Sequence, residues 1–491
     1  MSLRRISPYP LITLITLIPL TPLITLKTMK RKSTPVHVGR IVIGGDNPIR
    51  IQSMATTDTN DTEGSVAQAK RIIDAGGELV RFTTQGTREA ENMKNISARL
   101  KADGYMQPLV ADVHFTAHTA DVAAQYCEKV RINPGNYVDP GRTFKHLDYT
   151  DEEYAEELRK IEARLIPFIN ICKEHHTAVR IGVNHGSLSD RIMSRYGDTP
   201  EGIVESCMEF LRIFRREHFD DVVISIKASN TVVMVTTVRL LVQTMDAEDM
   251  HYPLHLGVTE AGEGEDGRIK SAVGIGALLT EGIGDTIRVS LSEEPECEIP
   301  VARKLVELIP ECTRLRAEAE ASVKDHTITL TLDAPDWETL QLKAAMAAGA
   351  LLIDRKATQL VLQLKHPSVA GMPAGQQPLV TLADAILQAA RIKFTKTEYI
   401  SCPGCGRTLY NLQETIARIK AATSHLVGLK IGIMGCIVNG PGEMADADYG
   451  YVGAGRGRIS LYKAKECVMK NIPEEEAVDR LLELIETDKA V

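Results

Sequence analysis

The sequence predicts an α/β protein: a (β/α)₈ barrel of the TIM type, then a short insert, then a small C-terminal α+β domain. Between residues 49 and 291, eight short β-branched runs alternate with longer segments of helical periodicity. Eight strand–helix units in roughly 250 residues are what such a barrel requires. The regular alternation of strand-like and helix-like segments ends near residue 310. The residue composition changes again near residue 395, before a region rich in cysteine and glycine motifs.

The eight predicted strands are apolar and rich in valine and isoleucine. They begin at Ile49, Glu78, Pro108, Lys129, Ala178, Asp221, Pro253 and Asp285. The helix expected after the first strand opens at Thr62 and ends at the pair Gly76-Gly77, which are ordinary start and stop signals. The regular alternation assigns residues 36–309 to the barrel.

The residues at the carboxyl ends of the predicted strands are unusually polar. Chemistry in barrels of this type takes place at that end. Five of the strands end in a cation, and these cations are Arg81, Arg131, Arg180, Lys227 and Arg288. Other polar residues there include Asp112, His114, Asn133, Asn184, Glu260 and Ser290. In a protein of net charge −8, a convergent ring of cations favours a polyanionic ligand that carries phosphate, and structural ion pairs are the alternative.

Composition excludes several classes of protein. A chain of 491 residues with 44% hydrophobic content is long enough for more than one domain. The net charge of −8 and the 4% aromatic content argue against a nucleic-acid-binding protein, which needs a basic face with stacking rings. Nine cysteines without a regular framework do not suit a disulfide-stapled secreted protein. We therefore expect a protein of the reducing cytoplasm, with no nucleic-acid or membrane partner.

An apolar, low-complexity run over residues 11–26 precedes the barrel. A signal peptide is one interpretation of this run. Against it, Pro19 and Pro22 break any helix, and basic residues follow in place of a small-residue cleavage site. We expect that Met29 is the true first residue and that residues 1–35 are not part of the fold.

Two regions follow the barrel. Residues 310–394 offer two strand-like runs around a helix and then a patch rich in proline and glycine, with no chemical motif, so we interpret them as a spacer or packing subdomain. Residues 395–491 combine a strand, an amphipathic helix, a second strand that runs into a Gly/Pro turn, a glycine-rich hairpin and a closing helix. This pattern predicts a small α+β domain.

Three cysteines of this last region have the spacing of a metal site. Cys402 and Cys405 form a C-P-G-C-G turn, and Cys436 ends a predicted strand 31 positions later. Structural zinc is one interpretation, with Cys467 as the fourth sulfur. Because no second C-x-x-C or C-x-x-H lies near Cys436, three thiolates and the carboxylate of Glu443 favour an iron-sulfur cluster with one reactive iron. We expect the six other cysteines to be buried free thiols.

The cysteine motifs occur together with a set of barrel motifs. The C-terminal pair is SCPGCGRTLYNLQETI with IGIMGCIVNGPGE, and the barrel contributes GGDNPIRIQSM, ADVHF, VRINPGN, VRIGVNHGSL, ISIKASN, HLGVTEAG and IGDTIRVSLS. In this combination the sequence resembles the 4-hydroxy-3-methylbut-2-enyl diphosphate synthase family. The resemblance implies that Cys402, Cys405, Cys436 and Glu443 bind a [4Fe-4S] cluster.

The resemblance also implies a reaction and its partners. The substrate is 2-C-methyl-D-erythritol 2,4-cyclodiphosphate, which is opened and dehydrated by a two-electron reduction in the non-mevalonate isoprenoid pathway. The electrons arrive singly from reduced ferredoxin or flavodoxin. The positions that match the family's substrate contacts are Arg81, Arg131, Asn133, Arg180, Asn184, Lys227, Glu260, Arg288 and Ser290. A non-catalytic iron-sulfur electron carrier or a zinc-stabilised binding protein is the rival hypothesis, and both a monomer and a homodimer remain open.

Two carboxylates are the candidate catalytic residues. A cluster held by four thiolates is saturated, so an enzyme that binds a substrate oxygen at iron needs one exchangeable ligand, and the carboxylate of Glu443 suits that role. Glu260 follows the seventh predicted strand among the cations. For Glu260, proton transfer and structural ion pairing are both open.

The insert is where this chain departs from the family it resembles. Shorter members lack the segment, and others carry a much larger, barrel-like domain at this point. Around eighty residues cannot close such a barrel, which needs about 200 or more. The effect of the shortened insert on domain geometry is left open by the sequence.

Overall fold

The barrel strands lie where the sequence predicts them. The computed structural model describes residues 30–114, 116–140, 143, 145–375, 377–437 and 446–489. The strands are β3 (Arg50–Met54), β4 (Leu79–Thr84), β5 (Leu109–Val113), β6 (Lys129–Ile132), β7 (Ala178–Asn184), β8 (Val222–Lys227), β9 (His255–Leu256) and β10 (Thr286–Ile287). They form one sheet in the order β8-β7-β6-β5-β4-β3-β10-β9. A parallel bridge from Ile224 to Leu254 closes the ring, so the predicted fold class is confirmed.

Helices surround this barrel. They include α1 (Thr62–Asp74), α2 (Thr87–Ala102), α3 (Ala117–Ala123), α5 (Asp151–His175), α7 (Pro200–Arg216), α8 (Thr231–Ala247), α9 (Gly264–Leu279) and α10 (Glu298–Glu307). Two short helices, α4 (Pro134–Tyr137) and α6 (Asp190–Tyr196), lie in the connections. Several begin at a side-chain cap: the Asp61 carboxylate accepts a bond from the Gly64 backbone N–H at α1, and Asn230 accepts from Val232 and Val233 at α8.

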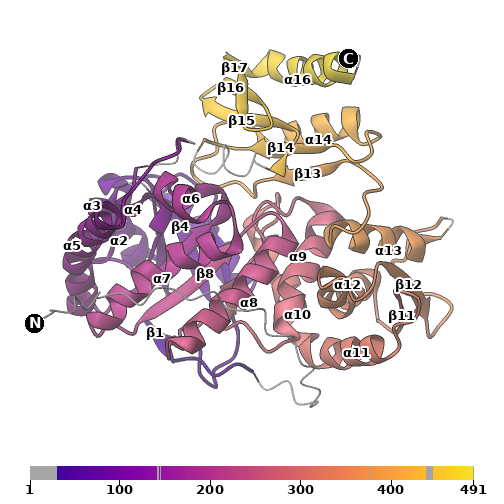
Figure 1. Ribbon diagram of the computed structural model, residues 1–491, viewed down its shortest axis with the longest axis horizontal. Coiled ribbons are helices and arrows are strands. Elements are labelled where there is room, and N and C mark those ends of the chain that lie inside the picture. The colour runs from indigo at the N-terminus through magenta and orange to yellow at the C-terminus, as the bar shows by residue number, and fades with distance from the viewer. Residues whose placement is uncertain are drawn as a thin grey trace, which may run out of the picture.

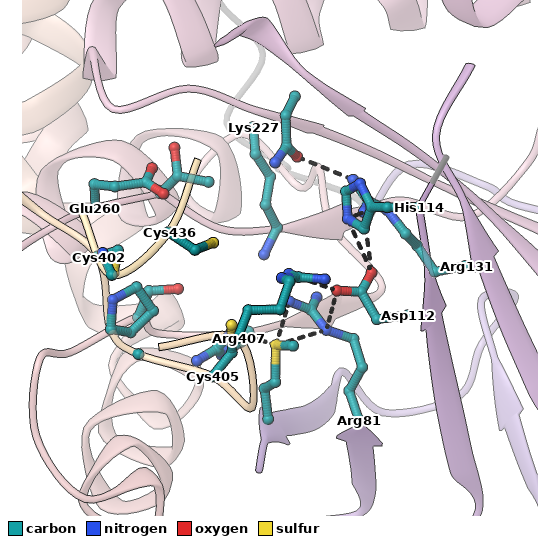
Figure 2. A pocket seen from close by; sticks show the side chains of 18 of the residues that line it. Arg81, Asp112, His114, Arg131, Lys227, Glu260, Cys402, Cys405, Arg407 and Cys436 are labelled. Atoms are coloured by element: carbon teal, nitrogen blue, oxygen red, sulfur yellow. Dashed lines mark hydrogen bonds and ion pairs between the residues drawn. The ribbon is translucent and has the colours of Figure 1, made fainter. Parts of the chain in front are cut away.

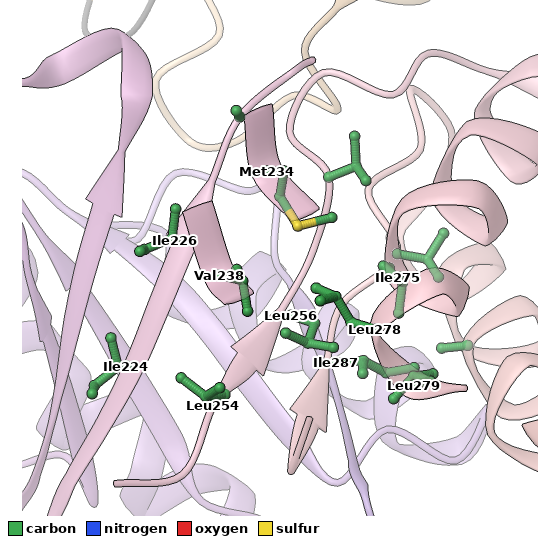
Figure 3. Close-up of a cluster of buried hydrophobic side chains, with 14 of the residues drawn as sticks. Ile224, Ile226, Met234, Val238, Leu254, Leu256, Ile275, Leu278, Leu279 and Ile287 are labelled. Carbon is green, nitrogen blue, oxygen red and sulfur yellow. The ribbon is translucent and has the colours of Figure 1, made fainter. Parts of the chain in front are cut away.

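Apolar side chains seal the contact between the strands and the outer helices. Figure 3 shows this contact for β8, β9 and β10 against α8 and α9. The side chains drawn there include Ile224, Ile226, Met234, Val238, Leu254, Leu256, Ile275, Leu278, Leu279 and Ile287, and none is more than 2% exposed. Burying one such side chain contributes about 1.5–3 kcal/mol, so this layer holds the polar strand ends in place.

A hairpin covers the amino end of the barrel. β1 (Val36–Val38) and β2 (Ile41–Ile43) pair in antiparallel fashion. Their buried residues pack against apolar side chains that lie near the starts of the barrel strands, such as Leu79, Val110 and Val223. Only the opposite, carboxyl end of the barrel is therefore left for a ligand.

The insert packs on the side of the barrel. It contains α11 (Ile309–Ala321), β11 (Thr327–Leu332), α12 (Trp337–Ile353), β12 (Gln359–Leu364) and α13 (Pro378–Ala389), and β11 and β12 form a parallel pair. Every residue of α12 except Glu338 is buried, and its apolar side chains belong to the same core as those of the barrel helices. Figure 1 shows α12 and α13 beside α9, between the barrel and the β11–β12 pair.

The C-terminal domain is a five-stranded sheet with two helices. Its strands are β13 (Glu398–Ser401), β14 (Lys430–Met434), β15 (Tyr449–Gly455), β16 (Arg458–Lys463) and β17 (Glu466–Pro473), in that order across the sheet. The helices are α14 (Leu412–Thr423) and α16 (Glu474–Lys489). In Figure 1 this domain lies over one end of the barrel. Because β13 and β14 are parallel neighbours, the segments that follow them meet at one edge of the sheet.

No helix among the described residues is both long enough and apolar enough to cross a membrane. The low-complexity run over residues 11–26, for which a signal peptide was one interpretation, lies outside the described residues.

The crossing of α12 over α9 gives a test of this packing. A Cβ atom on Gly349 would lie 2.8 Å from the carbonyl oxygen of Val273 in α9, closer than such atoms approach. In an open helix, replacing glycine by alanine gains about 1 kcal/mol. We expect Gly349→Ala instead to lower the free energy of unfolding by about 1–2 kcal/mol, because overpacking outweighs that gain.

Thermal or denaturant unfolding measures this change. The matched control is Thr329→Val on the exposed face of β11, which we expect to change stability by less than about 0.5 kcal/mol. A Gly349→Ala protein as stable as the wild type contradicts the close helix crossing.

Candidate active site between the barrel and the C-terminal domain

A cavity of about 710 Å³, part of it open to solvent, lies between the carboxyl end of the barrel and the C-terminal sheet. We call it the interdomain cavity (Figure 2). From the barrel it is lined by Met54, Arg81, Asp112, His114, Arg131, Arg180, Asn184, Lys227, Thr259, Glu260, Arg288 and Ser290. From the C-terminal domain it is lined by Cys402, Pro403, Gly404, Cys405, Arg407, Met434, Gly435 and Cys436. One cavity therefore brings the predicted cations and the three motif cysteines together.

The five predicted cations come from five different strands of the barrel or the residues just after them. Arg81, Arg131, Arg180 and Lys227 lie on β4, β6, β7 and β8, and Arg288 follows β10. We call these five side chains the cationic ring; all are buried. The guanidinium of Arg180 has two nitrogens, Nε and one terminal nitrogen, without a hydrogen-bond partner in the described part of the chain. Buried donors of this kind normally have an acceptor, so the ring is built for an anion.

One carboxylate lies among these cations. Asp112 is 3.0 Å from Arg131 and 3.9 Å from Arg81. Burial by itself raises the pKa of Asp112, but Arg81 and Arg131 outweigh burial and hold that pKa well below its ordinary value. Burial, followed by the charges of Arg81 and Arg180, lowers the pKa of Lys227 well below its ordinary value. The cavity thus holds more positive charge than Asp112 balances.

Arg288 differs from the other members of the ring because it has a carboxylate of its own. Glu298, in α10, accepts bonds from two nitrogens of Arg288 at 2.8 and 3.0 Å. The hydroxyl of Ser53 also donates to Glu298, at 2.7 Å. This arrangement fixes the direction of the Arg288 side chain.

The predicted polar contacts fall into two groups. Asn184 and Ser290 line the interdomain cavity, and the Asn184 side-chain oxygen accepts a bond from Arg131 at 3.3 Å. Asn133 is not among the residues that line it. Its amide oxygen instead accepts from the Gly135 backbone N–H at the start of α4, and its amide nitrogen donates to Ser187 at 2.8 Å. The structure therefore places Asn133 behind the cavity wall, as a helix cap.

Glu260 lies in the cavity wall with an unusual backbone. Its φ of 49° is in the left-handed region, which a residue with a side chain adopts at a cost. The carboxylate is buried, its Oε2 atom has no hydrogen-bond partner in the described part of the chain, and burial raises its pKa. Within 4 Å we find no cation paired with it in that part of the chain, which argues against the ion-pair alternative.

Three titratable residues that line the cavity, Asp112, His114 and Arg407, were not among the predicted substrate contacts or cluster ligands. His114 follows the third barrel strand, contacts Arg131, and has its pKa lowered to about 3 by burial and by the charge of Arg131, so it is neutral at pH 7. Arg407 directly follows the C-P-G-C-G turn. The signal for His114 was its position at a strand end beside Asp112, and the signal for Arg407 was its position next to a predicted ligand.

The motif cysteines lie at the edge of the C-terminal sheet that faces the barrel. Cys402 follows β13 and Cys436 follows β14 closely. The backbone N–H of Gly435 donates to the Cys402 sulfur at 3.2 Å. Backbone N–H groups aimed at sulfur suit a thiolate that binds a metal cluster.

Cys467, the fourth sulfur ligand of the zinc interpretation, lies far from the three motif cysteines. Cys467 lies on β17, at the opposite edge of the sheet from β13. Strands in a sheet are spaced by about 4.8 Å, so three strand spacings separate β17 from β14. The zinc interpretation that used Cys467 is therefore wrong. The prediction of buried thiols holds for Cys127, Cys172, Cys207 and Cys312, but Cys297 is exposed and Cys467 is half-buried.

The described residues contain no group of three or more His, Cys, Asp or Glu side chains arranged around a single metal ion. The ligands of an iron-sulfur cluster bind different iron atoms, so they need not converge on one point. Glu443, the predicted fourth ligand, lies outside the described residues.

Contacts within the same chain hold the C-terminal domain against the barrel. A parallel bridge joins Ala261, next to Glu260, to Ser401, next to Cys402. The Ser292 hydroxyl donates to the Cys402 carbonyl oxygen at 3.0 Å. Four ion pairs also cross the boundary, between Lys270 and Glu398, Lys420 and Glu263, Lys396 and Asp266, and Arg407 and Asp112.

Comparison with known proteins agrees with this geometry. Residues 33–303 match the family described as the GcpE TIM-barrel domain, and residues 398–487 match the GcpE protein C-terminal domain. The chain belongs to the GcpE family. Relatives in this family carry the name 4-hydroxy-3-methylbut-2-en-1-yl diphosphate synthase (flavodoxin), so the resemblance found in the sequence is confirmed.

Two GcpE relatives illustrate the match. A protein of Bacteroides fragilis is 53% identical, with 94% of this chain and 96% of the relative covered. A protein of Porphyromonas gingivalis is 47% identical, with 93% and 97% covered. The two alignments extend over 600 and 576 positions, more than the 491 residues of this chain, so these relatives hold segments that this chain lacks.

Replacing Asp112 tests the charge balance of the ring. Removing one partner of a buried ion pair costs about 3–5 kcal/mol, because the cations are left without compensation. We expect Asp112→Asn to destabilise the protein by this amount at pH 7. Because the pKa of Asp112 is lowered by folding, its contribution is present above pH of about 4, the ordinary value, and is lost as the pH falls through the lowered pKa.

Thermal unfolding of both proteins across pH measures this difference. Asp103→Asn is the control, since Asp103 is an exposed carboxylate that also pairs with cations, Lys70 and Arg99. An Asp112→Asn protein with wild-type stability at pH 7 contradicts the role of Asp112 as the counter-charge of the ring.

Proposed function

We propose that this protein catalyses the reductive ring opening and dehydration of 2-C-methyl-D-erythritol 2,4-cyclodiphosphate to 4-hydroxy-3-methylbut-2-enyl diphosphate in the non-mevalonate isoprenoid pathway. The observation that carries the proposal is that the cationic ring and the three motif cysteines line one cavity. The cationic ring suits a bound diphosphate, and the three cysteines suit a redox cluster. Curated relatives that cover almost all of this chain bear the name of this enzyme.

The rival hypothesis, a non-catalytic electron carrier or a zinc-stabilised binding protein, does not account for the barrel. A carrier needs its cluster near the surface and has no use for five buried cations in front of it. Glu260 and the ring are instead what a reaction on an anionic substrate requires.

The residues present suit a [4Fe-4S] cluster. Cys402, Cys405 and Cys436 supply thiolates, Gly435 donates a backbone hydrogen bond to one of them, and Glu443 is the proposed fourth ligand. When bound, the cluster would pass the two electrons of the reduction from the external donor to the substrate, one at a time. Reduced flavodoxin or ferredoxin is the proposed donor, and flavodoxin is the one that the relatives' names carry. The proposed compartment is the cytoplasm.

In this proposal, side chains of the barrel bind the substrate and donate the proton that the reaction takes up. Arg81, Arg131, Arg180 and Lys227 hold the diphosphate and stabilise the negative charge that it gains when the ring C–O bond breaks. The overall step takes up two electrons and one proton and releases water. Burial raises the pKa of Glu260, which favours the protonated carboxyl that can give this proton to the departing hydroxyl oxygen.

The site is complete within one chain, apart from Glu443, which the structure does not describe. The proposal therefore needs no second subunit, and a homodimer would consist of two independent sites.

Anaerobic turnover of the cyclic diphosphate with a chemical reductant tests the function, and Arg180→Leu tests the binding role of the ring. A charge-assisted hydrogen bond contributes about 1.5–3 kcal/mol, so we expect KM to rise by about 10- to 100-fold. The cluster absorption should stay unchanged, because Arg180 lies in the barrel. Lost absorption with an unchanged KM would refute the assignment.

Glu443→Cys tests the proposed exchangeable ligand. A fourth thiolate binds iron more firmly than a carboxylate does, so the variant should keep its cluster absorption while turnover falls to background. Glu414→Cys on the exposed start of α14 is the control for adding a thiol to this domain. If Glu443→Cys still opens the cyclic diphosphate at near the wild-type rate, the exchangeable-ligand role is excluded.

A further inference from the structure

We infer that the insert is an interface between two copies of this chain. The free edge of β11 pairs with the same edge of a second copy, antiparallel about a two-fold axis at Leu330, so that two inserts form one four-stranded sheet. This pairing does not depend on the proposed reaction, because no residue of the insert lines the interdomain cavity.

The sheet of the insert has only two strands, so each of them is an edge strand. Its buried side chains, such as Ile328 and Leu330, belong to the core that includes α12. Figure 1 shows the β11–β12 pair at the outer end of the insert, with α12 between the pair and the barrel. An unprotected edge is a template for a further strand, and a sheet of two strands gains stability from one.

The backbone of β11 bonds to β12 through its even-numbered residues. The Gln359 N–H donates to the His326 carbonyl oxygen at 3.1 Å, and the Lys365 N–H donates to the Leu332 carbonyl oxygen at 2.9 Å. In a strand, the backbone groups of successive residues point to opposite sides. The odd-numbered residues of β11 therefore direct their N–H and C=O groups to the free edge, and they are Thr327, Thr329 and Thr331.

The first of these three residues is already occupied. Thr327 exchanges two hydrogen bonds, of 2.8 and 3.2 Å, with Lys324 in the turn that precedes β11. Thr329 and Thr331 have no backbone partner of this kind among the described residues. Two N–H groups and two C=O groups are thus left at this edge.

One register pairs all four groups. In antiparallel strands a hydrogen-bonded pair of residues exchanges two bonds. When Thr329 faces Thr331 of the second copy, and Thr331 faces its Thr329, four bonds form across the axis at Leu330. Pairing Thr329 with itself would leave half of the groups unpaired, because Thr327 is occupied. The two threonines are exposed on the same face of the sheet, so the register keeps the apolar face of both copies on one side.

The charges at the strand ends favour this edge of the sheet. Antiparallel pairing of β11 brings the end of one strand beside the start of the other, where the exposed Asp333 of one copy meets the exposed Lys324 of the second. By contrast, β12 is basic at both ends, with Lys356 before it and Lys365 after it, so pairing β12 with itself would bring like charges together.

The middle of β11 has none of the features that prevent edge pairing. Its sequence TITLTL contains no charged residue, glycine or proline. Natural edge strands usually carry such residues where pairing must be avoided. A two-fold pairing also closes, because each copy uses its own β11 edge. Pairing of β11 with β12 of another copy would instead leave a free edge at each end and build open filaments.

The experiment measures the mass of the cluster-loaded protein by analytical ultracentrifugation over a concentration series. We expect a monomer that converts to a dimer and to nothing larger. Hydrogen exchange locates the interface: the amides of Thr329 and Thr331 should exchange slowly in the dimer and lose this protection on dilution.

A charge exchange tests the register. Asp333→Lys should weaken the dimer Kd at least about 10-fold, because two ion pairs become repulsions. The double variant Lys324→Asp/Asp333→Lys should restore the wild-type Kd. The two positions flank a six-residue strand of about 20 Å, so they cannot compensate for each other within one chain.

Thr329→Pro tests the backbone bonds. Proline removes an N–H that faces the free edge and leaves the bonds to β12 in place, so we expect the dimer Kd to weaken at least about 10-fold. Thr329→Ala is the matched control, since it keeps the N–H and should dimerise like the wild type. If Thr329→Pro does not fold, Asp333→Lys still decides the question. Turnover per chain should be equal in all of these proteins.

Three results would overturn the inference. One is a wild type that stays monomeric at every concentration or grows beyond a dimer. The second is a dimer that neither Asp333→Lys nor Thr329→Pro weakens, since it would use another surface. The third is a double variant that dimerises no better than Asp333→Lys. None of these results bears on the proposed reaction, which turnover of the cyclic diphosphate tests separately.

Discussion

The convergence of buried positive charge at the carboxyl end of the barrel is the constraint on which the rest of the site depends. Five barrel strands each contribute a cation to one cavity, and Asp112 is the carboxylate that lies among Arg81, Arg131 and Arg407. So much charge is stable out of water only with a counter-ion, and a diphosphate is a suitable one. The separate carboxylate of Glu298 fixes Arg288 and leaves the other cations for the ligand.

The rest of the fold leaves the carboxyl end of the barrel open to a ligand. The C-terminal domain, which carries the motif cysteines, covers that end. The β1–β2 hairpin closes the amino end, and an apolar layer packs α8 and α9 against the barrel strands. The insert shares the barrel core through α12. From α13, which lies beside α9, the chain continues into β13 of the C-terminal domain. Through this route the cysteines of the same chain face the ring.

The sequence predicted the parts of the structure that depend on local pattern. The eight barrel strands and the five cations were predictable, because alternation and strand ends are visible in one dimension. The position of Arg407 in the cavity was not predictable, because its partner Asp112 is far away in the chain and meets it only when two domains pack. The cap formed by Asn133 was also not predicted, because a strand-end position does not reveal that the side chain caps α4. Cys467 failed as a ligand because only the strand order of the sheet places β17 at the far edge.

The central claim is that one chain assembles the whole site, and a mixing experiment tests it most directly. An Arg180→Leu chain lacks a ring cation, and a Cys436→Ala chain lacks a cluster ligand. If each chain closes on itself, an equimolar mixture reduces the cyclic diphosphate no faster than the average of the two variants measured alone. Recovery toward one quarter of the wild-type rate or above would mean that barrel and cysteines from different chains form the site, and it would contradict the account.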